Sequence, residues 1–198
     1  MRREDWDRRY AKVENLWSAK PNRFLVVEVE SLAPGRALDL ACGEGQNAIW
    51  LASIGWRVDA VDYSPVAIAK ARARAERDGV DVAFEEADLV EYEPQPAAYD
   101  LVLLLYLHLP AEEHRLVLKR AARALAPGGT LVLLGHDLLN ATEGVGGPSD
   151  NSLLYTPDDI AGELEGLEIE KAERVLRDVA GSERPAIDCL VRARRQGS

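Results

Sequence analysis

The stretch Ala37-Leu38-Asp39-Leu40-Ala41-Cys42-Gly43-Glu44-Gly45 decides the fold of this 198-residue chain. Its first half is an apolar run typical of a buried strand, and the Gly-x-Gly after it predicts a turn from which a helix begins at Gly45. Glycines adopt turn angles that other residues resist, and they let a ligand approach bare backbone. Because the start of a helix offers unpaired N–H groups, a small polar ligand with a carboxylate or a phosphate is expected there.

Predicted strands and helices alternate on both sides of this turn. Strands are expected at residues 36–41, 56–61, 80–85, 99–105 and 130–134, and helices at 46–54, 65–78 and 111–125. Several strands are apolar on both faces, which indicates a parallel sheet covered by helices on each side. Residues 167–179 and 186–193 predict two more strands with no helix between them, which should pair as a hairpin. The predicted fold class is α/β: a Rossmann-like, seven-stranded, mostly parallel sheet with helices on both faces and a C-terminal antiparallel hairpin.

Large side chains recur at helical spacing near the N-terminus. Trp6, Tyr10, Val13 and Trp17 fall on one stripe of a helix expected within residues 3–18. This stripe predicts a helix packed on the domain or, alternatively, a lid over a ligand pocket with Trp17 or Tyr10 facing the ligand. A second helix is expected over residues 22–32, a long loop over 137–156, and a short helix near 157–164.

Composition restricts the classes of partner. The formal net charge of −10 argues against nucleic acid, because phosphate backbones need clustered Lys and Arg. Cys42 and Cys189 lie far apart, so neither a disulfide nor a zinc site is expected, and no metal is predicted. The chain starts without an apolar leader and contains no stretch of membrane-spanning length, so a cytoplasmic protein without a membrane partner is expected. Nothing in the sequence sets the oligomeric state.

A carboxylate beyond the second strand narrows the ligand to an adenosine compound. The pattern Gly43-x-Gly45-x-x-Ala48 fits the dinucleotide fingerprint, and the strand at 56–61 leads to Asp62. A carboxylate at that position can accept hydrogen bonds from both ribose hydroxyls of an adenosine. NAD and S-adenosylmethionine both satisfy this pattern.

Other features favour S-adenosylmethionine. Asp39 precedes the glycines, where a carboxylate can bind the ammonium of an amino acid but would repel a pyrophosphate. Ala87-Asp88-Leu89 follows the third strand, where a backbone amide and a carboxylate can bind the adenine edge. No Tyr-x-x-x-Lys and no second domain are present to transfer a hydride. The alternatives are purely structural: Asp39 as a cap of the loop, and Asp88 as a turn residue.

These motifs resemble, in order and spacing, those of the class I S-adenosylmethionine-dependent methyltransferases. The likeness covers roughly residues 36–136 and rests on five stretches: residues 38–45, Val61-Asp62-Tyr63-Ser64, Glu86-Ala87-Asp88-Leu89, Tyr99-Asp100-Leu101-Val102 and Leu125-Ala126-Pro127-Gly128-Gly129. Trp6-Asp7-x-Arg9-Tyr10 and the Leu16-Trp17…Pro21-Asn22 stretch are similar to the start of the tellurite-resistance and thiopurine methyltransferase-like branch.

The resemblance implies roles for individual residues. The methionine part of the cofactor would be held by Asp39, Ala41, Gly43 and Gly45, and the ribose by Asp62. Tyr63 would pack on the adenine, with Ala87, Asp88 and Leu89 at its edge, and Leu105 or Tyr106 would lie beneath the sulfonium. S-adenosylhomocysteine would be the product formed from the cofactor.

Methyl transfer from a sulfonium is an in-line displacement, and a base is needed only when the acceptor must lose a proton. Candidates for acceptor binding or base catalysis are Tyr106, His108 and His136 beyond the fourth and fifth strands, with Asp137 beside them. The alternatives are structural: His108 as a helix N-cap or loop residue, and His136 with Asp137 as anchors of the loop 137–156. His114 is expected on a helix surface. The single domain would comprise an N-terminal helical cap (1–33), a cofactor-binding core (34–136) and an acceptor-side loop with the terminal hairpin (137–198).

The sequence therefore predicts a methyltransferase for a small-molecule acceptor that receives the methyl group on oxygen, nitrogen, sulfur or a metalloid. Two other classes of function stay open at this point. One is an NAD- or nucleotide-dependent enzyme on a similar sheet, and the other is a non-catalytic module that binds S-adenosylmethionine.

Overall fold

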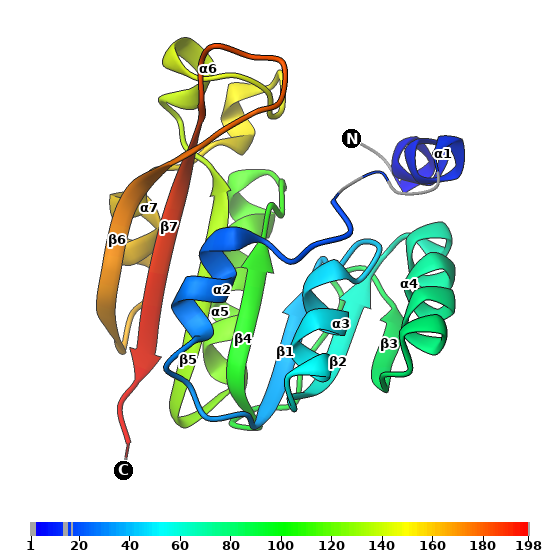
Figure 1. Cartoon of the computed structure of the whole chain (residues 1–198). Helices are drawn as coiled ribbons and strands as arrows, with labels where there is room; N and C mark the ends of the chain where they lie inside the picture. Colours follow the sequence, from blue (N-terminus) through cyan, green and yellow to red (C-terminus); the bar gives the residue numbers. More distant parts are fainter. Residues whose placement is uncertain (1–2, 14–15, 17, 198) are drawn as a thin grey trace.

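Seven strands form one sheet in the order β3-β2-β1-β4-β5-β7-β6 in the computed structural model, which describes residues 3–13, 16 and 18–197 (Figure 1). The strands are β1 (Arg36–Leu40), β2 (Arg57–Asp62), β3 (Val82–Glu86), β4 (Tyr99–Leu105), β5 (Leu125–His136), β6 (Leu167–Arg177) and β7 (Ala186–Arg195). The strands β1 to β5 pair in parallel, and β7 runs antiparallel to both β5 and β6. The predicted fold class is confirmed, including the C-terminal antiparallel hairpin.

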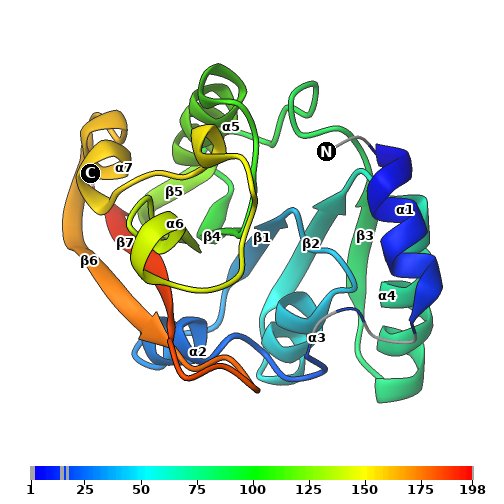
Figure 2. The same cartoon turned by 90° about the horizontal axis from the view of Figure 1, so that it is seen from above.

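Helices cover both faces of this sheet. They are α1 (Arg3–Lys12), α2 (Arg23–Val29), α3 (Gln46–Ser53), α4 (Pro65–Asp78), α5 (Ala111–Ala124), α6 (Asn140–Glu143) and α7 (Pro157–Glu163). Figure 2 shows α2 and α3 on one side of the sheet and α5 and α7 on the other. The bounds of α4 follow from its ends, since the Ser64 hydroxyl accepts a hydrogen bond from the Ala67 amide and Gly79 is left-handed.

The apolar side chains divide between two cores, one on each face. Along β4, Leu101, Leu103 and Leu105 pack with α2, α3 and α4, whereas Val102 and Leu104 pack with α5 and α7. A central strand that is buried on both faces has no polar side, which explains the continuous apolar run of residues 101–105. Asp39 on the neighbouring strand is a carboxylate within this apolar environment.

Several boundaries differ from those predicted. The strand β3 begins at Val82, and α2 ends at Val29. The larger error is at Pro127-Gly128-Gly129, which was expected to separate a helix from the fifth strand but lies inside β5. A side chain at Gly129 would come within 2.7 Å of the Tyr99 carbonyl oxygen, so the backbone of β5 already lies against β4 at this point. The register of the two strands shifts here, as expected for an irregularity in the ladder.

The N-terminal helix is shorter than its apolar stripe predicts. It ends at Lys12, Val13 is 45% exposed, and Trp17 lies outside the described residues. The Lys70 ammonium donates hydrogen bonds to the Tyr10 and Val13 carbonyl oxygens at 2.5 and 2.6 Å. These bonds satisfy carbonyls at the end of the helix, where a cation is also favoured by the helix dipole.

The segment 137–156 is more ordered than a long loop. It contains α6 and a 3₁₀ turn at Asn151–Leu153, and Asp137 forms a bridge with Tyr155. The Asn140 side chain accepts a hydrogen bond from the Ile187 amide at 2.7 Å and donates one to the Gly146 carbonyl at 2.9 Å. The segment is thereby fixed to the start of β7.

The prediction that His114 lies on a helix surface is wrong. This residue is only 5% exposed, and its ring lies 4.8 Å from the Tyr155 ring. The reason is tertiary, because the end of the 137–156 segment and α7 cover this part of α5.

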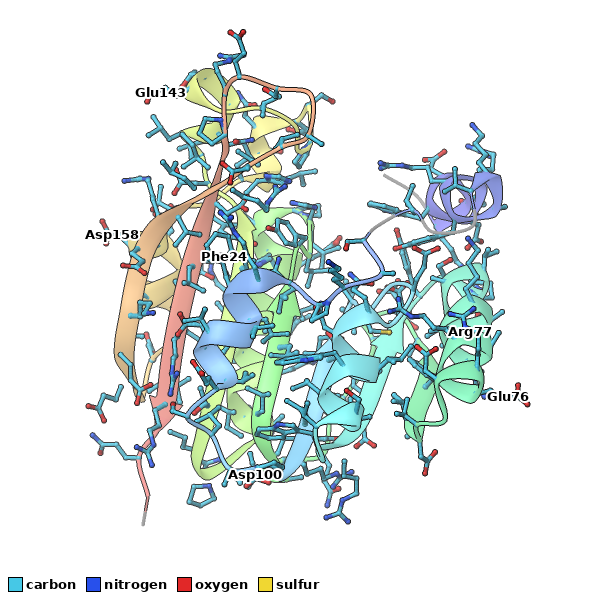
Figure 3. The ribbon with its side chains drawn as sticks, viewed as in Figure 1. Phe24, Glu76, Arg77, Asp100, Glu143 and Asp158 are labelled. Carbon is cyan, nitrogen blue, oxygen red and sulfur yellow. The ribbon has the colours of Figure 1, made fainter. Side chains whose placement is uncertain are left out.

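Figure 3 shows the two ends of the parallel strands, with Asp100 at the amino edge of the sheet and Glu143 above the carboxyl edge. Figure 1 shows α1 and α6 standing over that carboxyl edge, on opposite sides of β1 and β4. No helix in the described ranges has both the length and the apolar character needed to cross a membrane.

Candidate active site

The glycine loop leaves β1 through three left-handed residues. Ala41, Gly43 and Gly45 have φ angles of 65°, 54° and 76°. The Cys42 amide donates a hydrogen bond to the Val61 carbonyl at 3.0 Å, which ties the loop to the end of β2. The backbone is therefore held in a conformation that favours glycine at two of these positions.

The Asp62 carboxylate joins this loop to the end of β2. One oxygen accepts a hydrogen bond from the Gly43 amide and the other from the Ser64 amide, both at 2.9 Å. Burial raises the pKa of Asp62, although these backbone hydrogen bonds oppose the shift. Each carboxylate oxygen retains a second lone pair, so the group can still accept hydrogen bonds from two hydroxyls.

Asp39 is a buried carboxylate with an unused oxygen. It is 1% exposed, and the Ala48 backbone in the first turn of α3 acts on its pKa in the direction opposite to burial. Within the described part of the chain, Oδ2 of Asp39 has no hydrogen-bond partner. Burial and the nearby Asp62 raise the pKa of Asp39 to about 7. A buried carboxylate oxygen without a donor fits the ammonium group of an amino-acid ligand.

The residues expected near an adenine follow β2 and β3. Tyr63 is half-buried, and the Ala87 amide donates to the Asp62 carbonyl at 3.1 Å. The exposed Asp88 accepts a hydrogen bond from the Val90 amide at 2.9 Å, so its role as a turn residue is confirmed for this oxygen. The Leu89 side chain is buried in the core on the α5 side of the sheet.

Helix α1 covers the glycine loop, through contacts that the sequence did not indicate. A side chain at Gly43 would lie 3.0 Å from the Tyr10 hydroxyl, and the Ser64 hydroxyl donates a hydrogen bond to Asp7. The buried Glu44 carboxylate pairs with Lys70 at 3.0 Å and accepts a hydrogen bond from the Leu16 amide at 2.8 Å. Of the two interpretations of this helix, packing on the domain is confirmed by its contacts with α4, and it also lies over the loop.

Gly43→Ala is expected to weaken binding of S-adenosylhomocysteine at least tenfold, because the added methyl group meets the Tyr10 hydroxyl and the positive φ is strained. Gly79→Ala is the matched control, since Gly79 is also left-handed but has no atom within 4 Å of the added group. Calorimetric titration of both variants should show a loss of affinity for the first alone. Equal affinities would show that close approach to Gly43 is not needed.

A second cluster lies beyond β4, β5 and the start of β7. The Tyr106 hydroxyl donates a hydrogen bond to Oδ2 of Asp188 at 2.8 Å, and Arg177 Nε donates to the same oxygen at 2.7 Å. Asp188 is fully buried. Burial would raise its pKa, but contacts with His136, Arg177 and Tyr106 outweigh that effect and lower it.

Two of the predicted histidines meet in this cluster. The His108 and His136 rings stack 5.5 Å apart with 15° between their planes, and Nδ1 of His136 lies 3.2 Å from Oδ1 of Asp188. Among the described residues, Nδ1 of His136 nevertheless has no partner that meets hydrogen-bond geometry. Burial, followed by His136 and His114, lowers the pKa of His108 to about 4. His108 is therefore neutral near pH 7.

Sequence reasoning missed Asp188 and Arg177. Period-two alternation in residues 186–193 placed Asp188 on a polar face, but both faces of β7 are buried along this stretch. The sequence offered one signal for Asp188, namely a carboxylate that lies between the apolar residues Ile187 and Cys189 of a predicted strand. Its meaning depends on the register, which pairs His136 directly with Asp188.

A separate hollow lies elsewhere. It has a volume of about 550 Å³ and opens at the amino edge of the sheet, lined among others by Trp56, Asp100, Arg192 and Arg194. None of the predicted site residues that the structure describes lines it. In open α/β sheets ligands bind at the carboxyl edge. Both the glycine loop and the cluster around Asp188 lie at this edge.

A known protein family matches part of this chain. A family model described as a methyltransferase domain matches residues 37–129, which contain the glycine loop, Asp62 and Ala87-Asp88-Leu89. Residues 37–129 are thus a methyltransferase domain of the class I, S-adenosylmethionine-dependent family. S-adenosylmethionine is therefore its cofactor, and the alternative of an NAD- or nucleotide-dependent enzyme is not supported.

One relative of this methyltransferase is the trans-aconitate 2-methyltransferase of Methylobacterium nodulans. The two are 34% identical over 138 residues, which is 68% of this chain and 51% of that protein. The chain spans about half the length of the curated relatives it matches.

Solved structures share the fold of this methyltransferase. N-methyltransferase NodS from Bradyrhizobium japonicum, in complex with S-adenosylhomocysteine, matches over 97% of both chains with a TM-score of 0.72 and 21% identity. TehB from Haemophilus influenzae matches over 88% of this chain and 62% of its own, with a TM-score of 0.76 and 18% identity. At these identities the likeness shows the fold alone, and membership of the tellurite-resistance or thiopurine branch stays a prediction.

Proposed function

We propose that this chain transfers a methyl group from S-adenosylmethionine to a small molecule bound beyond the ends of β4 and β5. The observation that carries the proposal is the cluster of Tyr106, His108, His136 and Asp188, in which His136 and Asp188 are buried. Register places Leu105 of β4 beside the loop, because Leu104 pairs with Leu40 at the end of β1. The two halves of the site are thus adjacent.

The cofactor half of the site is proposed to bind S-adenosylmethionine through complementary charge and shape. Oδ2 of Asp39 would accept from the ammonium group, the backbone of Ala41, Gly43 and Gly45 would enclose the methionine part, and Asp62 would accept from the ribose hydroxyls. Tyr63, Ala87, Asp88 and Leu89 would border the adenine, as predicted. When bound, the cofactor supplies a methyl group that is already activated as part of a sulfonium.

The acceptor half is proposed to align the acceptor for in-line displacement. His136 and Asp188 lie on the adjacent strands β5 and β7, and Tyr106 follows the last residue of β4, so the sheet fixes the separations of these three residues. Leu105 and Tyr106 would border the transferred methyl group. The buried surroundings suit a small organic molecule better than a polynucleotide, and the formal charge of −10 points the same way.

The test is a methylation assay with S-adenosylmethionine carrying a deuterated methyl group and a panel of small hydroxyl, amine, thiol and carboxylate compounds. Binding of S-adenosylhomocysteine by calorimetry and a labelled methylated product by mass spectrometry are expected. Binding without turnover of any panel member would instead favour a non-catalytic S-adenosylmethionine-binding module. Absence of binding would overturn the proposal.

A further inference from the structure

We propose that His136, positioned by Asp188, is the general base of this site and that the acceptor is an uncharged hydroxyl compound. The inference rests on the proposed function and names its substrate class. It begins from a cross-strand pair: His136 ends β5, and its register partner on β7 is Asp188. Partners directly opposite on antiparallel strands present their side chains to the same face of the sheet.

Asp188 is held by groups from two other elements. Tyr106 follows β4 and Arg177 ends β6, and both donate hydrogen bonds to Oδ2. The other oxygen, Oδ1, lies 3.2 Å from Nδ1 of His136. A hydrogen bond from Nδ1 to this oxygen would place the proton on Nδ1 and leave the lone pair on Nε2. Tyr106 and Asp188 are therefore positioning residues.

Between the two stacked histidines, only His136 is suited to receive a proton. His108 is desolvated, with Nε2 buried and without a hydrogen-bond partner in the described structure, and burial outweighs the opposing influence of Asp188 on its pKa. His136 has the fully buried Asp188 carboxylate beside it, which stabilises the imidazolium that forms. His108 can instead use its unpaired nitrogen to hydrogen-bond the acceptor.

The position of His136 relative to the cofactor loop suits this role. It lies on β5, two strands from β1, with β4 between them. Adjacent strands are about 4.8 Å apart, so His136 is separated from the loop by roughly 10 Å, with Tyr106 between. An acceptor of a few ångströms fits between the methyl donor and the base.

The charges around His136 favour a neutral acceptor. Arg177 is paired with Asp188 at 2.7 Å, and Arg174 is paired with Asp137 at 2.9 Å. Both carboxylates are fully buried, so each of them balances the charge of its arginine. These two pairs therefore present no uncompensated positive charge to an acceptor carboxylate or a metalloid oxyanion.

The proposed step balances without another reactant. The acceptor hydroxyl loses its proton to Nε2 of His136 as its oxygen forms a bond to the methyl carbon. The carbon–sulfur bond breaks and its electron pair stays on sulfur, which gives uncharged S-adenosylhomocysteine. His136 then returns the proton to solvent. An amine that is already neutral needs no base before attack, so a positioned carboxylate–imidazole pair points to a hydroxyl.

The first experiment determines the tautomer of His136 by long-range proton–nitrogen NMR on protein labelled with ¹⁵N-histidine. The chain has three histidines, so His108→Gln and His114→Gln assign the signals. At pH 8 the His136 proton is expected on Nδ1 in the wild type and redistributed in Asp188→Asn. A proton on Nε2 in the wild type, or an unchanged tautomer in the variant, would overturn the positioning role.

The second experiment measures turnover with a matched acceptor set: phenol, aniline, thiophenol and benzoate. Phenol is expected to be the methylated member. His136→Gln is expected to lower kcat about a hundredfold and Asp188→Asn at least tenfold, with KM and the affinity for S-adenosylhomocysteine within twofold of wild type.

Asp59→Asn is the matched control for Asp188→Asn. Like Asp188, Asp59 is an aspartate that accepts hydrogen bonds from a tyrosine and an arginine. It lies at the amino edge of the sheet, where Tyr99 donates to it at 2.9 Å and Arg36 at 2.8 Å. This variant should lose comparable thermal stability and keep full kcat.

The outcomes distinguish a failure of this inference from a failure of the proposed function. Methylation of aniline, thiophenol or benzoate in preference to phenol, or no methylation of any of the four with cofactor binding intact, overturns the hydroxyl class. Equal losses of kcat in Asp59→Asn and Asp188→Asn reduce Asp188 to a structural residue and overturn its positioning role. Failure to bind S-adenosylhomocysteine overturns the proposed function itself.

Discussion

Asp62→Ala is expected to weaken binding of S-adenosylhomocysteine about a thousandfold. The carboxylate would accept two hydroxyl hydrogen bonds from the ribose, and hydrogen bonds to a charged group contribute about 1.5–3 kcal/mol each. Two such bonds correspond to roughly 3–6 kcal/mol, and a thousandfold change is about 4 kcal/mol. The substitution also releases the Gly43 amide, which Asp62 holds at 2.9 Å, so the glycine loop loses one of its anchors.

Two further variants separate these effects. Asp62→Asn keeps an acceptor oxygen but not the charge, so an intermediate loss of affinity is expected. Asp81→Ala removes an exposed carboxylate just before β3, outside the proposed site, and should bind normally. Calorimetric titration of the three variants, with circular dichroism to verify folding, is the measurement. Wild-type affinity in a folded Asp62→Ala protein would remove Asp62 from the cofactor site.

The affinity for S-adenosylhomocysteine is expected to fall about tenfold per pH unit as the pH decreases from 7 to 5. Burial and Asp62 raise the pKa of Asp39 to about 7 in the free protein, so Asp39 becomes protonated over this range. Only the ionised carboxylate attracts the ammonium group, and the bound cation lowers the pKa of Asp39 in the complex. Binding below pH 7 therefore requires release of a proton, whereas above pH 7 the affinity should level off.

Asp39→Asn tests this linkage directly. The asparagine cannot ionise, so the variant should bind weakly at pH 7 and show a much flatter dependence on pH. Titrations at pH 6 in buffers of different ionisation enthalpy should also detect the released proton with the wild type. Asp62 faces Asp39 and is itself buried, so a dependence on pH equal to wild type in Asp39→Asn would assign the titration to Asp62.

Most of the sheet could be predicted because its signals are local. The apolar runs of β1 and β4, the helix ends at Ser64 and Gly79, and the paired C-terminal strands each depend on neighbouring residues. The errors arose where distant groups decide the local structure. Lys70 on α4 satisfies the carbonyls where α1 ends, and Tyr155 with α7 buries His114 on α5.

The cofactor half of the site could be predicted from the sequence, whereas most of the acceptor half could not, for the same reason. Asp39, the glycines and Asp62 follow one another along consecutive strand ends, so spacing alone places them at one edge of a parallel sheet. The partners of His136 come from the ends of β6 and β7, and an antiparallel register cannot be derived from residue spacing. A shift of one residue would have turned Asp188 to the other face.

The stretch 37–45 by itself determined a strand, a glycine turn and a helix, and together with Asp62 it determined the class of ligand. The conformational freedom of a glycine and the acceptor oxygens of a carboxylate are properties of those residues themselves, so they can be recognised without a structure. Only the tertiary structure decided that Oδ2 of Asp39 is buried without a donor among the described residues and that Asp188 lies beside His136. Burial and cross-strand register are properties of the whole sheet, and they set which ionisable groups remain available for binding and chemistry.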